Sequence, residues 1–502
     1  MNKFVQAIAN ETNMTTTENG HAAASTTGSA VLDLYSQVGG LRGQDFNNRV
    51  KPLLIKALKE YKLLATKAVF YARDTKEGTG ERELFRNMIH WMAKNYPETV
   101  RYNIAYIPVY GRWDDLYYLI DTPLEEDMWK YIKMQLFLDQ IHLSKGEPVS
   151  LLAKWLKSCN ASSKESRKLG RLTAQHLGLT EANYRRMLSK LRKSINIVES
   201  KISSNNWEEV EYDKIPSRAG MIYRKAFKRH DAERYEEYIN AVNSGEKKIN
   251  TAMNTPQDLV HAYTKGSTYS RWFTPNFEED PTIEAMWKNL PDFVQSDENI
   301  LCMVDVSGSM QGRPVEISVG LGMYFAQHNK GAFHNIFMTF ESDPNFVKLD
   351  DDASFAENLK TTMLVPWGGS TNLNKACEKM LSFALENEVP KEDMPTRLII
   401  ISDMEIDSAS GHCSRNNILH IDELKEMYNK AGYDVPQVIY WNADSRDNHF
   451  QTKSDIKGTM LASGSSPVIF KSVLAMKDMV VTPLDAMLEV LNGERYSKIT
   501  VG

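Results

Sequence analysis

Three side chains that could bind a divalent cation follow one short apolar run. Residues 300–304 are all apolar, and they lead directly into Asp305, Ser307 and Ser309. Because these side chains stand at every second position and Gly308 lets the backbone turn, their oxygen atoms can converge from one tight loop. Carboxylates and hydroxyls are hard ligands, which suit Mg²⁺ or Mn²⁺ better than zinc. The spacing therefore predicts a site for a magnesium-class cation.

Two later loops offer further oxygen ligands. Thr371 follows the glycine-rich turn 367–370, directly before a predicted helix, and Asp403 follows the apolar run 398–401 and Ser402. If each loop follows a parallel strand, all three loops lie at the same edge of one sheet. Ser, Thr and Asp also cap helices, so a set of helix caps would explain the same residues without a metal.

The elements that must position these loops form an α/β pattern from about residue 298. Short apolar runs, which we interpret as strands, lie at 300–304, 335–340, 398–401, 438–441 and 468–470. They alternate with helical stretches near 315–328, 372–386, 421–431 and 483–491. Continuous apolar strands separated by helices are typical of parallel strands buried on both faces. The pattern predicts a doubly wound, Rossmann-like α/β domain over residues 296–502, with its ligands at the carboxyl ends of the strands.

The C-terminal motifs resemble the metal-ion-dependent adhesion site of von Willebrand factor A domains. The matching residues occur in the family's order: Asp305, Ser307, Ser309, Thr371 and Asp403. The resemblance implies that the two serines and the threonine bind Mg²⁺ or Mn²⁺ directly, whereas both aspartates act mainly through water. One coordination position then stays open for a partner's carboxylate or another anionic oxygen.

The third loop departs from the von Willebrand A pattern, because Met404 stands where the family often has glycine. Glu405 and Asp407 follow, and they could add charge near the ion or compete with an incoming carboxylate. A metal-dependent hydrolase would need a base to activate water, and these two carboxylates are the candidates. The scattered histidines form no pair with a nucleophilic Ser or Cys. We therefore expect a protein that is not an enzyme.

The N-terminal part of the chain is predicted to be helical. Residues 1–30 are rich in Thr, Asn, Ala, Ser and Gly, so we expect a flexible arm. Residues 31–295 follow as an α-helical module, with apolar residues at helical spacing in 50–71, 84–92, 128–143, 149–156, 164–177, 181–190 and 231–242. Many short helices without a strand pattern are typical of stacked helix pairs, although no strict repeat is visible.

The net charge of −5 conceals a basic block. Residues 151–234 contain 19 Lys and Arg against 9 Asp and Glu, so the rest of the chain is strongly acidic. Such a block favours a phosphate-rich partner, because bound cations release the partner's counterions. A solvated helix face is the alternative. We expect no membrane span and no secretion signal, and four widely spaced cysteines fit a reducing cytoplasm.

Several phrases in the helical part resemble the Ro ribonucleoprotein family, in which a TROVE module of HEAT-like repeats closes a ring against an A domain. The phrases include 78–85, 110–116, 151–156 and 225–231. The resemblance implies RNA as a partner, structured on the outer surface and single-stranded in the central hole. The basic candidates for RNA binding are Lys154, Lys157, Lys164, Arg167, Lys168, Arg171, Arg185, Arg186, Lys190, Arg192 and Lys193. Tyr184, Trp155 and Trp207 are aromatics on which bases could stack, unless they belong to the core.

The sequence thus predicts a cytoplasmic RNA-binding protein with a HEAT-like module and a von Willebrand A domain that carries Mg²⁺. The alternative is an assembly scaffold without RNA, whose metal captures a carboxylate of a partner protein. A homo-oligomeric structural role also stays open, since helical arrays assemble readily.

Overall fold

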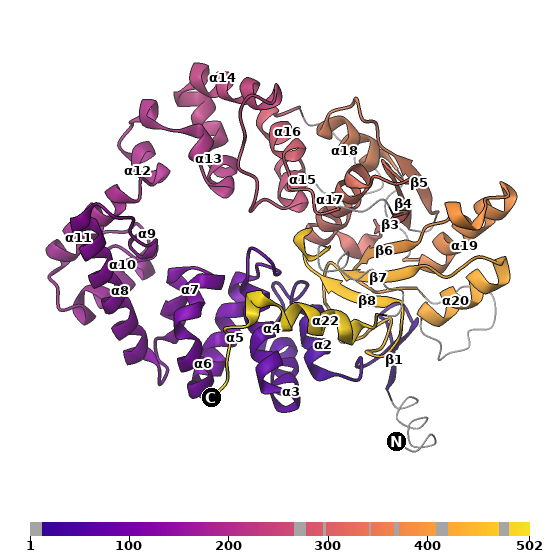
Figure 1. The fold of residues 1–502 in the computed structure, drawn as a ribbon, viewed down its shortest axis with the longest axis horizontal. Helices are drawn as coiled ribbons and strands as arrows, with labels where there is room; N and C mark the ends of the chain where they lie inside the picture. The colour runs from indigo at the N-terminus through magenta and orange to yellow at the C-terminus, as the bar shows by residue number, and fades with distance from the viewer. Residues whose placement is uncertain are drawn as a thin grey trace.

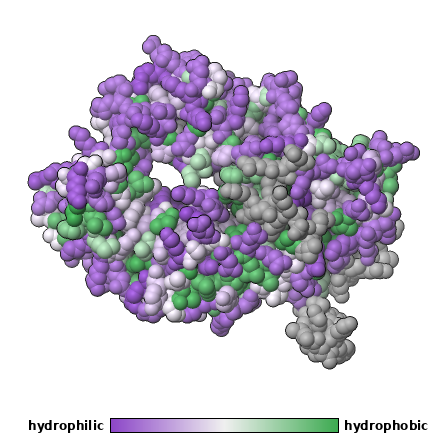
Figure 2. Space-filling model, in the orientation of Figure 1, coloured by the Kyte–Doolittle hydropathy of each residue, from purple (hydrophilic) through white to green (hydrophobic). Residues whose placement is uncertain are grey.

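The protein is a ring of helices that an α/β domain completes (Figure 1). The computed structural model describes residues 13–265, 278–294, 298–340, 343–365, 371–407, 420–470 and 481–502. Figure 2 shows an opening that passes through the middle of the molecule in this view. Around it the chain leads from α2 through α16 and then into the C-terminal sheet.

The C-terminal domain is built on a six-stranded, mostly parallel sheet with the order β5-β4-β3-β6-β7-β8. The strands are β3 Ile300–Asp305, β4 Ile336–Phe340, β5 Asn345–Lys348, β6 Arg397–Ser402, β7 Gln437–Asn442 and β8 Thr459–Ser463. All neighbours pair in parallel except β5, which pairs antiparallel with β4. The chain order reverses between β3 and β6, where a doubly wound sheet places its ligand site.

Alternate residues of each central strand enter different hydrophobic cores. Val304, Ile401 and Trp441 pack on the side of α17 (Arg313–His328), whereas Met303 and Ile400 pack on the other side. That second face is covered by α19 (Leu373–Glu386) and α20 (His420–Ala431). The sheet is therefore buried on both faces, which explains its uninterrupted apolar runs and confirms the predicted α/β class.

Two strand predictions were wrong or missing. Residues 468–470 are helical, and the parallel strand at that edge is β8 instead. Pro467 precedes this run and suits a first helical turn, and three apolar residues alone do not distinguish a strand from a helix. Strand β5 was not predicted, because its exposed lysine and phenylalanine give it no continuous apolar pattern.

Helices make up the described part of the N-terminal module after residue 30, as predicted. Their bounds are α2 Ala30–Gln37, α3 Lys51–Glu60, α4 Lys62–Arg73, α5 Arg82–Asn95, α6 Pro97–Asn103, α7 Ile107–Tyr110, α8 Glu125–Lys145, α9 Leu152–Trp155, α10 Lys164–His176, α11 Glu181–Ser194, α12 Val198–Ser203, α13 Ser217–His230, α14 Ala232–Asn243, α15 Pro256–Thr264 and α16 Pro281–Lys288.

The hydrophobic cores do not divide at the predicted domain boundary of residue 296. Helices α15 and α16 contribute Leu259 and Ile283 to the core on the α17 side of the sheet. In the opposite direction, α22 (Pro483–Asn492) and the turn after it place Met487 and Tyr496 in the core of the N-terminal helices. Each part of the chain thus completes the core of the other, and the ring closes on both sides.

Polar contacts reinforce the closure between residues that are far apart in sequence. Arg495 donates to both carboxylate oxygens of the buried Asp74, each at 2.7 Å, and Tyr496 donates to the same carboxylate at 3.1 Å. The backbone N–H of Thr500 donates to Asn103 Oδ1 at 3.1 Å. The chain after α22 therefore acts as a clasp on α4 and α6.

Two glycines after α2 permit a close approach in this closure. A Cβ atom on Gly39 would lie 2.3 Å from the carbonyl oxygen of Ser463, and one on Gly40 would lie 2.4 Å from Ser445 Oγ. Ser463 ends β8 and Ser445 follows β7, so the residues after α2 lie directly on the carboxyl edge of the sheet. Only glycine permits so close an approach of two backbones.

Residues 13–30 are not the predicted flexible arm, and residues 1–12 lie outside the described part. Met14–Thr16 (β1) and Ala22–Ala24 (β2) form an antiparallel hairpin, the N-terminal hairpin. Ala24 bridges to Phe450 and Gly20 bridges to Asp407, so the hairpin docks on the C-terminal domain. Ala22–Ala24 are buried there, and small side chains that look weakly hydrophobic in sequence allow this close packing.

Within the described ranges, no helix combines the length and the apolar character that crossing a bilayer requires. Cys159, Cys302 and Cys377 are buried free thiols, and Cys413 lies outside the described residues.

Candidate functional site

The structure brings the predicted hydroxyl ligands together at the carboxyl edge of the sheet. Ser307 Oγ and Ser309 Oγ lie 3.1 Å apart, and Thr371 Oγ1 donates to Ser307 Oγ at 3.1 Å. Ser307 and Thr371 are buried, whereas Ser309 is half-buried. Residues 366–370 of the glycine-rich turn lie outside the described part of the chain. The chain of oxygen atoms therefore reaches from the interior toward the surface.

The two predicted aspartates lie beneath these hydroxyls. Asp305 is 0% exposed and Asp403 is 1% exposed. The Ser307 backbone N–H donates to Asp305 Oδ1 at 2.9 Å, and Ser402 Oγ donates to Asp305 Oδ2 at 2.6 Å. Burial and then the nearby Asp403 carboxylate raise the pKa of Asp305 to about 7. Two buried carboxylates beside three hydroxyls fit the oxygen ligand set of Mg²⁺.

An arginine that sequence analysis did not single out binds the second aspartate. Arg446, in the loop after β7, donates to Asp403 Oδ2, and its Nε lies 3.8 Å from Asp444 Oδ2. The other Asp403 oxygen accepts from the Glu405 backbone N–H at 3.1 Å. Arg446 therefore supplies one positive charge to a site whose buried carboxylates carry more than one negative charge.

The departure at Met404 has a backbone consequence. Met404 has φ 67°, in the left-handed region where a side chain is disfavoured and glycine is preferred. Its N–H donates to Ser402 Oγ at 2.9 Å, and its carbonyl accepts from His449 Nε2 at 2.9 Å. Met404 thus adopts a left-handed turn conformation in the loop 403–407, and neighbouring hydrogen bonds hold it.

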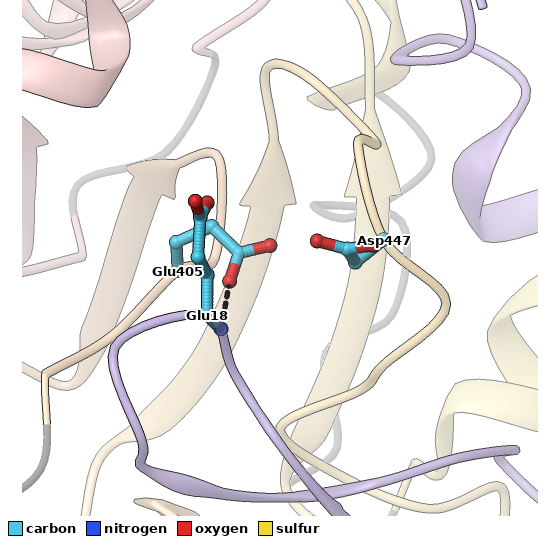
Figure 3. A group of neighbouring side chains, drawn as sticks. All are labelled: Glu18, Glu405 and Asp447. Atoms are coloured by element: carbon cyan, nitrogen blue, oxygen red, sulfur yellow. Dashed lines mark hydrogen bonds between the residues drawn. The ribbon is translucent and has the colours of Figure 1, made fainter.

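Three carboxylates form an acidic triad next to this loop (Figure 3). One oxygen each of Glu18, Glu405 and Asp447 lies within 4.8 Å of the other two. They come from the N-terminal hairpin, the loop after β6 and the loop after β7. Burial, followed by Asp403 and Asp447, raises the pKa of Glu405 to about 7. The acidic triad could hold a metal ion. The spacing of these residues in the sequence does not indicate that their three segments meet in the fold.

The RNA-binding candidates fall into two groups. Four half-buried side chains have partners inside the protein: Lys154 with Glu199, Lys157 with Asp114, Arg167 with two carbonyls, and Arg192 with the carbonyls of Ala153 and Leu156. Arg171 is exposed and pairs with Glu181 at 3.2 Å. The other six are exposed on α10 and α11, and among the described residues they have no acidic partner: Lys164, Lys168, Arg185, Arg186, Lys190 and Lys193.

Most of the candidate stacking aromatics are used in the core. Tyr184 is 0% exposed and Trp207 is 9% exposed, so neither offers a free face. Trp155 is half-buried, and the Arg112 guanidinium lies 4.0 Å from its ring centroid. The phrase around residue 112 is a buried ion network, in which Asp115 accepts from both Arg73 and Arg86 at 2.7 Å. The phrase around residue 80 forms the loop that leads into α5.

The fold and its sheet edge define a two-part protein, and its two parts match two families. Residues 17–147 and 149–299 match the family described as domain of unknown function DUF2828, and residues 299–495 match the domain of unknown function DUF7788. The first match covers more than half of the chain, so the chain belongs to the DUF2828 family. Neither description names the Ro or von Willebrand A families, so that resemblance stays a prediction.

One relative covers almost the whole chain. The uncharacterized protein L728 of Acanthamoeba polyphaga mimivirus is 26% identical over 519 residues, which span 95% of this chain and 87% of that protein. Among solved structures, the crystal structure of the Deinococcus radiodurans RO (RSR) protein aligns with 88% of this chain and 92% of its own, at 11% identity and a TM-score of 0.33. At that TM-score the two chains do not superpose as one body, and the likeness carries no functional assignment.

Proposed function

We propose that this protein is a non-enzymatic, cytoplasmic RNA-binding protein, in which a HEAT-like helical module joins a von Willebrand A domain that holds Mg²⁺. The observation that carries the proposal is the exposed basic surface of α10 and α11. Residues 164–194 contain nine Lys and Arg against two Glu. Seven of these basic side chains are exposed, and six of the seven have no acidic partner among the described residues.

Basic side chains without acidic partners are better explained by a polyanionic ligand than by a solvated helix face. A solvated helix face normally interleaves both signs of charge, because like charges at i, i+4 spacing destabilise a helix. On α11, Arg186, Lys190 and Lys193 follow that spacing and are all exposed. An RNA backbone offsets this repulsion and gains from the release of its counterions. The ring also has a central opening that can hold a single strand of RNA.

The test is RNA binding by the full chain and by Arg185→Glu/Arg186→Glu. Each arginine contributes about one phosphate contact, so we expect affinity to fall at least tenfold and the salt dependence to become shallower by about two contacts. The matched control is Lys56→Glu/Lys59→Glu, two exposed lysines on α3. Fluorescence anisotropy with a structured and a single-stranded RNA measures both quantities. Equal affinity of the two double variants would overturn the assignment.

In the C-terminal domain, Ser307, Ser309 and Thr371 would hold Mg²⁺ directly, and Asp305 and Asp403 would act through water. The bound ion would supply a positive charge at the sheet edge that accepts an anionic oxygen. The second candidate function is a metal-dependent scaffold for a protein partner. It is favoured by the half-buried Ser309, which brings the ligand set to the surface. A protein complex that EDTA and Asp305→Ala both abolish, and that nuclease leaves intact, would support this second function.

A further inference from the structure

The acidic triad lies where the N-terminal hairpin meets the C-terminal domain. The turn of the hairpin places Thr17, Glu18 and Asn19 on the loop 403–407. Thr17 Oγ1 donates to the Ile406 carbonyl at 2.6 Å, and Asn19 Nδ2 donates to the Glu405 carbonyl at 2.7 Å. These contacts fix the hairpin turn, so the Glu18 backbone lies beside the loop and brings its exposed carboxylate next to the other two acids.

One oxygen of the triad lacks a donor among the residues that the structure describes. Glu405 is 1% exposed, and its Oε2 accepts from the Glu18 backbone N–H at 2.6 Å. Its Oε1 has no hydrogen-bond partner in the described ranges, and Figure 3 shows a Glu405 oxygen directed toward Asp447. A buried, ionised carboxylate oxygen without a donor is costly. The arrangement therefore favours a positively charged ligand at this oxygen.

Among the described histidines, His449 lies beside the triad but does not donate to it. Its Nε2 donates to the Met404 carbonyl at 2.9 Å and lies 3.6 Å from Glu405 Oε1, beyond hydrogen-bond distance.

The nearby arginines balance only part of the negative charge. Arg446 is engaged with Asp403 and Asp444, and Arg49 donates to the Ser445 carbonyl at 3.0 Å. Both guanidinium groups interact electrostatically with Glu405. The carboxylates that share this region number five, namely Asp403, Asp444 and the three members of the acidic triad. Among the described residues, five carboxylates against these two arginines leave up to three negative charges, which a divalent cation would largely offset.

We propose that Glu18, Glu405 and Asp447 form a second divalent-cation site, of the calcium class, which fastens the N-terminal hairpin to the C-terminal domain. The ligand atoms of the triad all lie within 4.8 Å of one another, close enough to bind one ion. Three carboxylates suit Ca²⁺, whereas Mg²⁺ usually binds through one or two carboxylates and keeps several waters. Two members are exposed and leave room for water ligands. This site does not depend on the RNA proposal.

The proposed site is joined to the predicted magnesium site through one loop. The Glu405 backbone N–H donates to Asp403 Oδ1 at 3.1 Å, so a cation on the Glu405 side chain also fixes the orientation of the Asp403 carboxylate. Two sites coupled in this way influence each other's affinity reciprocally.

The experiment is calorimetric titration of the full chain with Ca²⁺ in the presence of saturating Mg²⁺. We expect one Ca²⁺ site, with a dissociation constant of about 0.1–1 mM because only three protein ligands contribute. The variant Glu18→Gln/Asp447→Asn keeps the buried Glu405 and should weaken Ca²⁺ binding at least tenfold. The control Glu378→Gln/Asp393→Asn removes two exposed carboxylates of the same domain and should bind Ca²⁺ like the wild type.

Hydrogen exchange gives a second readout. Ca²⁺ should slow amide exchange in residues 14–24 of the wild type and of the control, but not in Glu18→Gln/Asp447→Asn. The proposal is overturned if the wild type binds no Ca²⁺ up to several millimolar, or if the triad variant binds it as tightly as the control. It is also overturned if Ser307→Ala, rather than the triad variant, abolishes Ca²⁺ binding, since the ion would then lie among the hydroxyl ligands.

Discussion

Asp305 and Asp403 show how burial sets the chemistry of single residues. The raised pKa of Asp305 means that its carboxyl group is largely protonated below about pH 7 when no metal is bound. An ion held through water still favours the carboxylate over the protonated form, so Mg²⁺ binding should displace this proton. Below the pKa, affinity should therefore fall by up to about tenfold for each unit of pH, and above it affinity should level off.

Calorimetry with Mg²⁺ at about pH 6, 7 and 8 tests this expectation. Two buffers with different ionisation enthalpies count the protons released, which should approach one near pH 6 and zero near pH 8. In the metal-free protein, stability should change with pH in the opposite direction. Because folding raises the pKa of Asp305, the free energy of unfolding should fall as pH rises from the ordinary aspartate pKa toward about 7. An Mg²⁺ affinity that is constant from pH 6 to 8 would contradict the assigned role of Asp305.

Arg446 provides a second prediction at this scale. Replacement of Arg446 by Met removes the cation that offsets the buried Asp403, so the metal-free protein should lose about 1–3 kcal/mol of stability. Mg²⁺ supplies the missing charge, and its addition should raise the melting temperature more in Arg446→Met than in the wild type. Differential scanning fluorimetry with and without Mg²⁺ measures this, with Arg446→Lys as the control that keeps the charge. An equal or smaller Mg²⁺ effect in Arg446→Met would refute the idea that the arginine offsets the site's charge.

The clustering of Asp305, Ser307, Ser309, Thr371 and Asp403 could be predicted from sequence, because each residue follows a strand end or precedes a helix at one sheet edge. Arg446, Glu18 and Asp447 could not, since each reaches the site through packing between distant segments. Met404 indicated a departure from the family pattern, but only the structure shows that it adopts a left-handed turn conformation.

Among the elements, the N-terminal hairpin depends on a few buried polar contacts. Thr17 is 3% exposed and donates to the Ile406 carbonyl, so Thr17→Val leaves that buried carbonyl without a donor. We expect a loss of about 1–3 kcal/mol of stability and faster amide exchange in residues 14–24. The matched control is Thr16→Val, because Thr16 is exposed on the same hairpin. Urea denaturation compares the two variants, and equal midpoints would show that the Thr17 contact contributes nothing.

Element prediction succeeded where a hydrophobic period was long and failed where it was short. Helices α5, α8 and α14 and strands β3, β6 and β7 have continuous or periodic apolar patterns, and they occur where expected. The two strands of the hairpin consist of six Met, Thr and Ala residues. The hairpin is positioned by bridges to Phe450 and Asp407, so its own sequence shows no hydrophobic period. Residues 468–470 were misassigned for the same reason, since three apolar residues define no period.

At the scale of the whole molecule, ring closure rests on the approach of α2 to the sheet edge. In Gly39→Ala the new Cβ would overlap the Ser463 backbone, so the two segments must separate. We expect a loss of about 3 kcal/mol and a larger radius of gyration in small-angle X-ray scattering. Gly43→Ala is the control: it meets no atom within 4 Å and carries only the strain of φ 81°, which costs about 1 kcal/mol. If the two variants are equally stable, the closure does not depend on this contact.

The closed ring could be expected only from the family resemblance, because its contacts join distant parts of the chain. The sequence offers no local signal that Arg495 pairs with Asp74, 421 residues away. The charge block was visible in sequence, yet only burial separates the exposed cations of α10 and α11 from Arg167 and Arg192, which hold carbonyl groups inside the fold.

The clasp also has a consequence for synthesis of the protein on the ribosome. Asp74 emerges 421 residues before Arg495, and at about 5–20 residues per second this delay is roughly 20–80 s. During that time the nascent helical half holds a carboxylate without its arginine and an apolar surface that Met487 and Tyr496 later cover. Such an intermediate is prone to aggregation. We therefore expect the growing chain to need a chaperone that binds the first helices and leaves once residues 483–500 are made.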